Sequence, residues 1–98
     1  MSVTDESVLS FTRGHRLQHD RVRDIWLIQA PEKAFIAEET ASHILRLIDG
    51  KTSVGTIIKR LAEQFSAPPE VIGTDVHVLL SDLTEKGVLR ACHFPPRP

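Results

Sequence analysis

The sequence predicts an α+β domain in which a three-stranded antiparallel meander is followed by three helices. Three observations support this prediction. Apolar residues recur with a period of two between residues 16 and 37 and with a period of 3.6 afterwards. Short turn-forming segments separate the strands, which favours antiparallel neighbours. The chain has 98 residues, 41% of them hydrophobic, which suffices for one core but not for two domains.

The strands of the meander are expected over residues 16–19, 22–29 and 34–37. A turn at Asp20-Arg21 joins the first two, and residues 30–33 join the second to the third. The middle strand is apolar on both faces at its centre. One face is expected to contact the helices. The other face needs a cover from the N-terminal segment, a second copy of the chain or a partner protein.

Apolar stripes within residues 41–48, 54–65 and 72–83 predict the three helices. Gly50 is expected to end the first helix and Gly87 the third, because glycine readily adopts the left-handed cap conformation. Three strands followed by three helices give the order of a rearranged winged helix-turn-helix.

Residues 13–91 are expected to form the single domain. Residues 1–12 are mostly polar and predict a flexible N-terminal segment. Residues 92–98 contain three prolines and predict a Pro-rich tail that joins neither a helix nor a central strand.

The composition argues against several classes of partner and location. The net charge of −1 argues against a protein that mainly neutralises nucleic-acid phosphates, and no apolar run is long enough for a signal peptide or a membrane span. The single cysteine, Cys92, excludes an intrachain disulfide and fits a reducing compartment. The sequence therefore predicts a cytoplasmic protein without a membrane partner.

The cysteine and the histidines lack the arrangement that catalysis or metal binding needs. Cys92 and His93 are adjacent, so in an extended segment their side chains point to opposite faces, and no third residue is placed to orient the imidazole. His15 and His19 share a face on a strand, but the surrounding arginines repel a cation. We therefore expect no catalytic residue, no metal site and no cofactor.

A DNA-binding winged helix is the alternative function that the element order suggests. The third helix would then be the recognition helix, yet four acidic residues oppose one lysine between residues 70 and 86. The resulting negative charge of this helix opposes the counterion release that drives DNA binding. The arginines between residues 13 and 23 keep the alternative open, because they are able to contact phosphates as a wing.

The third strand lacks the features that usually protect a sheet edge. This strand contains no proline, no lysine and no other charged residue; its residues are Ala34, Phe35, Ile36 and Ala37. Such an edge is able to accept a further strand from another chain. The alternative is that the first ten residues or a second copy of the chain cover it.

The third helix carries a second face besides its core stripe. Val71, Asp75, Val78 and Asp82 are spaced by four, three and four residues, so they lie on one side of a helix. If this helix lies beside the third strand, these residues line a shallow groove. The alternative is an ordinary solvated helix face.

Several segments, in this order and spacing, resemble the PqqD family of peptide chaperones in pyrroloquinoline quinone (PQQ) biosynthesis. They are Arg13-Gly14-His15-Arg16-Leu17, Asp20 with Arg23, Leu27-Ile28-Gln29-Ala30-Pro31-Glu32, Ile44-Leu45 with Ile48-Asp49-Gly50, Val71-Ile72 with Asp75-Val76, and Leu83 with Gly87-Val88-Leu89. The resemblance covers about residues 11–91.

The resemblance implies a non-catalytic RiPP recognition domain, that is, one for a ribosomally made precursor peptide. Such a domain binds the precursor PqqA and presents it to PqqE, a radical S-adenosylmethionine enzyme. In related domains the peptide adds as a strand to the third strand and lies against the third helix. Carried onto this sequence, the peptide-binding residues are Ala34, Phe35, Ile36, Ala37, Val71, Asp75, Val78 and Asp82.

The middle strand is the candidate surface for the enzyme or for a second subunit of a homodimer. The residues concerned are Ile25, Trp26, Leu27 and Ile28. For Trp26 an ordinary core position is the alternative, because a tryptophan in a central strand usually packs inward.

Overall fold

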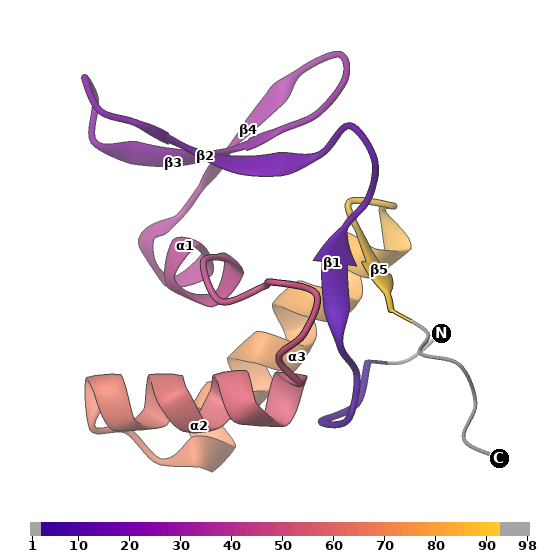
Figure 1. Ribbon diagram of the computed structural model, residues 1–98. Helices are drawn as coiled ribbons and strands as arrows, with labels where there is room; N and C mark the ends of the chain where they lie inside the picture. The colour runs from indigo at the N-terminus through magenta and orange to yellow at the C-terminus, as the bar shows by residue number, and fades with distance from the viewer. Residues whose placement is uncertain (1–2, 93–98) are drawn as a thin grey trace, which may run out of the picture.

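The computed structural model describes residues 3–92 and confirms the α+β architecture (Figure 1). A three-stranded sheet lies on one side of the helices, and a separate two-stranded pair lies beside α3. The elements are β1 (Leu9–Phe11), β2 (Arg16–Asp20), β3 (Ile25–Gln29), β4 (Ala34–Ala37), α1 (Glu39–Leu45), α2 (Val54–Phe65), α3 (Pro69–Glu85) and β5 (Leu89–Ala91). Among the described residues, no helix is long and apolar enough to cross a membrane.

The meander has the predicted antiparallel order β2-β3-β4. Its middle strand begins at Ile25, three residues later than predicted, because Asp20 organises a turn. The Asp20 carboxylate accepts the backbone N–H groups of Val22 and Arg23 and the Arg23 side chain at 3.0 to 3.2 Å. Asp24 then adopts a left-handed conformation with φ of 54°. Val22 consequently lies at the hairpin tip and is 95% exposed.

The register defines which side chains face the helices. Ile28 is opposite Phe35, and Trp26 is opposite Ala37. Ile28 and Ala37 are buried in the core, so the alternation of the strand places all four side chains on the inner face. The residues between them lie on the outer face.

The helices form where the apolar stripes predict them, with one shorter than expected. Helix α1 ends at Leu45, and the chain then turns through Ile48 to Gly50, whose φ is 77°. Ser53 caps α2 by accepting the backbone N–H of Thr56 at 3.2 Å. In α3, Val76 and Leu80 are fully buried against the other helices.

The N-terminal segment differs from the prediction of a flexible stretch over residues 1–12. In the described part, β1 pairs antiparallel with β5, and Leu9 is 1% exposed. Asp5 accepts the backbone N–H of Gly55 through its carbonyl at 2.8 Å and lies 2.7 Å from the His77 ring through its carboxylate. Burial of Val3 and Leu9 in the core explains this order. Residues 93–98 of the predicted tail lie outside the described residues.

Asp49 leads to a prediction about pH. Its carboxylate accepts the backbone N–H groups of Lys51 and Thr52 and the Thr52 hydroxyl at 2.8 to 3.0 Å, which orders the turn before α2. These bonds, foremost that from Lys51, lower the pKa of Asp49 below its ordinary value of 3.8. The stabilisation is therefore present above that ordinary pKa and is lost as the pH falls through the lower folded value. Urea unfolding between pH 6 and pH 2 is expected to show a smaller acid loss of stability in Asp49→Asn than in the unmodified protein; equal losses would contradict this role.

Candidate functional site

The outer edge of β4 is free of strand partners within the described part of the chain. The sheet ends at β4, and residues 9–11, which were one candidate cover, pair with β5 instead. Ile36 at this edge is 65% exposed. The edge therefore has the accessibility that strand addition requires.

The backbone pattern shows which residues offer their hydrogen-bonding groups at this edge. The N–H of Ala30 donates to the carbonyl of Lys33 at 2.9 Å, so this pair closes the β3–β4 turn. Antiparallel pairing alternates between bonded and non-bonded pairs, which assigns Phe35 and Ala37 to bonds with β3. The N–H and C=O groups of Ala34 and Ile36 therefore point away from β3.

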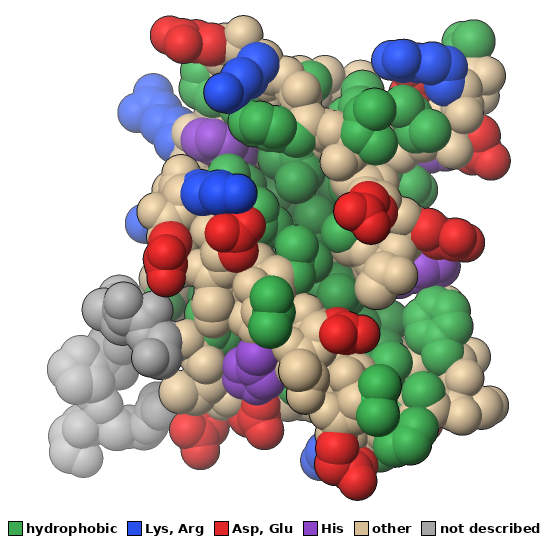
Figure 2. Space-filling model, turned by 180° about the vertical axis from the view of Figure 1, so that it is seen from behind, with side chains coloured by type: hydrophobic (Ala, Val, Ile, Leu, Met, Phe, Trp, Pro, Cys, Tyr) green, Lys and Arg blue, Asp and Glu red, His purple; other side chains and the backbone are tan. Residues whose placement is uncertain are grey.

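A groove of about 670 Å³ lies between β4 and the C-terminal half of α3. Phe35 forms the strand side, and Leu79 and Leu83 form the helix side. Ile28 and Val88 also line the groove, and both belong to the core. Figure 2 shows hydrophobic side chains along a hollow on this face, with acidic side chains on both of its sides.

Charged side chains lie at the end of the groove that is next to the β3–β4 turn and the C-terminal end of α3. The Lys33 ammonium lies 5.0 Å from the centre of the Phe35 ring, a cation–π contact. Lys86 forms an ion pair with Asp82 at 3.0 Å, and both line the groove. This end therefore carries one cation, Lys33, that has no ion-pair partner among residues 3–92.

The predicted residues of α3 do not all lie at this groove. Asp82 lines it, whereas Asp75 lines a neighbouring pocket between the helices. Val78 lines a third depression beside Asp5, and Val71 is exposed. The four residues share one narrow face, but they extend over eleven residues of α3 and meet different neighbouring elements along the helix, so their spacing alone did not show which of them face β4.

Sequence reasoning missed Leu79, Leu83 and Lys86 as lining residues of the groove. Leu79 and Leu83 belong to the apolar stripe predicted within residues 72–83, and Leu83 is buried. A residue at the border of the core stripe serves both the core and the groove floor. Leu79 and Leu83 lie one helical turn apart, and both are neighbours of Asp82 on the helix. This spacing is the signal that would have identified them.

The four candidate interface residues of β3 lie on two faces. Ile28 is 6% exposed and belongs to the core. Trp26 lies on the same inner face. The Arg46 guanidinium lies 4.9 Å from the centre of the Trp26 ring, and the centres of the His19 and Trp26 rings are 4.7 Å apart. The prediction is therefore corrected: Ile25 and Leu27 lie on the outer face, whereas alternation turns Trp26 and Ile28 inward.

Cys92, His15 and His19 each have a different polar partner. The Cys92 thiol lies 3.4 Å from the Ser10 hydroxyl, His15 is hydrogen-bonded to the Thr12 hydroxyl at 2.9 Å, and His19 contacts Asp24 at 2.9 Å. Within residues 3–92, no group of three or more His, Cys, Asp or Glu side chains is arranged to hold a metal ion. His93, the proposed neighbour of the thiol, is outside the described residues.

Comparison with known proteins identifies relatives that share most of the chain. A relative from Gluconobacter oxydans (strain 621H), named PqqA binding protein, is 69% identical over 87 residues, which cover 89% of this chain and 91% of the relative. A PqqA binding protein from Bradyrhizobium diazoefficiens (strain JCM 10833 / USDA 110) is 39% identical over 91% of this chain and 86% of its own length.

Two solved structures share the fold. The solution structure of the PqqD truncation of Methylobacterium extorquens PqqCD, described as a functional and stand-alone RiPP recognition element, is 32% identical, with a TM-score of 0.78 over 91% of this chain and 95% of that one. The crystal structure of PqqD from Xanthomonas campestris is 36% identical, with a TM-score of 0.57 over 91% of this chain and 99% of that one.

The family described as coenzyme PQQ synthesis protein D (PqqD) matches residues 26–89. This match contains β3 except its first residue, β4 and all three helices, and therefore both sides of the groove. Because the match covers more than half of the chain and agrees with relatives along nearly its full length, the chain belongs to the PqqD family.

Proposed function

We propose that this protein is a non-catalytic peptide chaperone in PQQ biosynthesis that binds the precursor peptide PqqA. The peptide adds as a fourth strand to β4, and its inward-facing side chains enter the groove beside α3. The free edge of β4 next to an apolar groove is the observation that supports this proposal best. The relatives named PqqA binding protein support the identity of the peptide.

The magnitudes require both the edge and the groove. Four outward backbone groups on Ala34 and Ile36 contribute about 2–6 kcal/mol in total, whereas micromolar binding needs about 8 kcal/mol after the cost of ordering the peptide. Burial of a few hundred Å² of apolar peptide surface in the groove adds several kcal/mol, at about 25 cal/mol per Å². The edge and the groove together are therefore sufficient for micromolar binding.

The outer face of the sheet is the surface that we assign to the enzyme PqqE. Leu27 and Ile36 are opposite each other on β3 and β4, and Ile25 lies on the same face. A peptide strand added to β4 extends this face, so an enzyme docked there contacts the chaperone and the peptide together. A second copy of the chain is the alternative occupant. Because the peptide is made on ribosomes and Cys92 is a free thiol, we place this step in the cytoplasm.

A titration of ¹⁵N-labelled protein with PqqA, followed by NMR, tests the peptide site. We expect the amide signals of Ala34 and Ile36 to shift strongly, because their backbone groups form hydrogen bonds with the peptide. The signals of residues 79–86 are expected to shift as well, because the peptide side chains contact them in the groove. Shifts confined to the β2–β3 hairpin, or no shift at millimolar peptide, would refute the proposal.

The same labelled protein, mixed with duplex DNA at low salt, tests the alternative of a DNA-binding winged helix. We expect no shift, because α3 carries four exposed acidic residues, Glu70, Asp75, Asp82 and Glu85. Salt-sensitive shifts at Arg21 and Arg23 would favour the DNA-binding alternative instead.

A further inference from the structure

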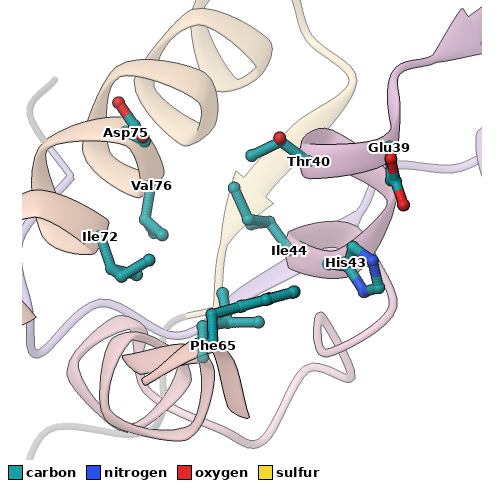
Figure 3. A pocket seen from close by; sticks show the side chains of 9 residues that line it. Glu39, Thr40, His43, Ile44, Phe65, Ile72, Asp75 and Val76 are labelled. Atoms are coloured by element: carbon teal, nitrogen blue, oxygen red, sulfur yellow. The ribbon is translucent and has the colours of Figure 1, made fainter. Parts of the chain in front are cut away.

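A second pocket of about 370 Å³ lies between α1, α2 and α3 (Figure 3). Figure 3 shows Ile44 of α1, Phe65 of α2, and Ile72 and Val76 of α3 around one space. Phe65 is partly exposed at the rim, where its ring contacts His43 edge-on with the ring centres 5.0 Å apart. The floor is therefore apolar and already formed without a ligand.

This pocket continues the groove along both of its walls. On one wall, Glu38 lines the groove and Glu39, the next residue, lines the pocket. On the other wall, Leu79 lines the groove and Asp75, one helical turn earlier, lines the pocket. A peptide that leaves the edge of β4 beyond Ala37 therefore reaches the pocket next.

The rim of the pocket is acidic on both sides. Glu39 on α1 and Asp75 on α3 lie on opposite sides of it, and both are exposed (Figure 3). Neither forms an ion pair with another residue in the described range, and no lysine or arginine lines the pocket. By contrast, the far end of the groove carries the cation Lys33, unpaired among the described residues, beside the Lys86–Asp82 ion pair. The two ends of the combined surface thus differ in charge.

We infer that this pocket is a second anchor site for the peptide of the proposed function, taking an apolar side chain that is adjacent to a basic one. The apolar side chain is buried against Phe65 and Ile72, and the basic one lies at the acidic rim, next to Asp75. The charge difference between the two ends orients the peptide, because the reversed direction removes the basic residue from the carboxylates.

The geometry gives the spacing of the two anchors. Asp82 and Asp75 are seven residues apart on α3, which is about 10 Å along the helix. An extended peptide covers this distance in about three residues. The apolar residue in the pocket is therefore expected about three residues from the one in the groove, beyond the part that pairs with β4.

Asp75→Lys and Phe65→Ala test the pocket, with Glu63→Lys and Val22→Ala as matched controls. All four side chains are exposed, so the fold is expected to persist in each variant. With synthetic PqqA in calorimetric titrations, we expect about tenfold weaker binding for Asp75→Lys and about fivefold weaker binding for Phe65→Ala. The controls are expected to bind as the unmodified protein does.

Peptide variants complete the test. Replacing each lysine or arginine of PqqA by glutamate, one at a time, is expected to identify one position at which the change weakens binding to the unmodified protein and restores binding to Asp75→Lys. Unchanged affinity of both pocket variants, while the unmodified protein binds PqqA, would overturn this inference and leave the proposed function intact. Absence of binding to the unmodified protein would instead overturn the proposed function.

Discussion

Replacing Leu9 by alanine is expected to lower the free energy of unfolding by about 2–5 kcal/mol. Leu9 is 1% exposed and belongs to the core cluster, although it lies in a three-residue strand near the N-terminus. Its carbonyl accepts the backbone N–H of Gly50 at 3.1 Å, which ties β1 to the turn before α2. Truncation leaves a cavity between these elements that the surrounding backbone fills only partly. Urea unfolding measures the loss.

Val22→Ala is the matched control for this experiment, because Val22 is 95% exposed at the hairpin tip. Its effect is expected to stay within about 0.5 kcal/mol. If Leu9→Ala were as mild as this control, the N-terminal strand would not be part of the core, and the sequence-based prediction of a flexible segment would hold.

Replacing Ile36 by proline is expected to weaken PqqA binding at least tenfold while the protein stays folded. The proline removes the outward N–H of Ile36 and places its ring where the guest strand approaches. A lost hydrogen bond of about 1 kcal/mol together with this steric block accounts for the size of the effect. Edge strands tolerate proline when its position faces solvent, so the β3–β4 pairing is expected to persist.

Two further variants separate backbone from side-chain effects. Ile36→Val keeps the N–H and is expected to bind PqqA nearly as well as the unmodified protein. Phe35→Pro removes an N–H that bonds to β3, and is therefore expected to lower stability rather than only affinity. Full binding by Ile36→Pro, measured by calorimetry, would contradict strand addition at this edge.

Much of this architecture was predictable because it depends on local patterns. The change of apolar period after Ala37 predicts where strands give way to helices, and Gly50 and Gly87, both with positive φ, mark where turns follow α1 and α3. The bare edge at residues 34–37 was also readable, since it depends only on which residues are absent from one short strand. The position of Asp24 in the left-handed region was not, so the start of β3 was predicted too early.

The class of fold, the order of the meander strands and helices, and the lack of protecting residues on the third strand follow from the sequence alone, because they depend on residue type and periodicity along the chain. Three features required the three-dimensional structure: β1 pairs with β5 and leaves β4 free, Asp82 faces the groove while Asp75 faces the neighbouring pocket, and Ile28 is core. These features depend on contacts between residues distant in sequence and on the angle at which α3 crosses the sheet. Neither is recorded in the spacing of residues along a single element.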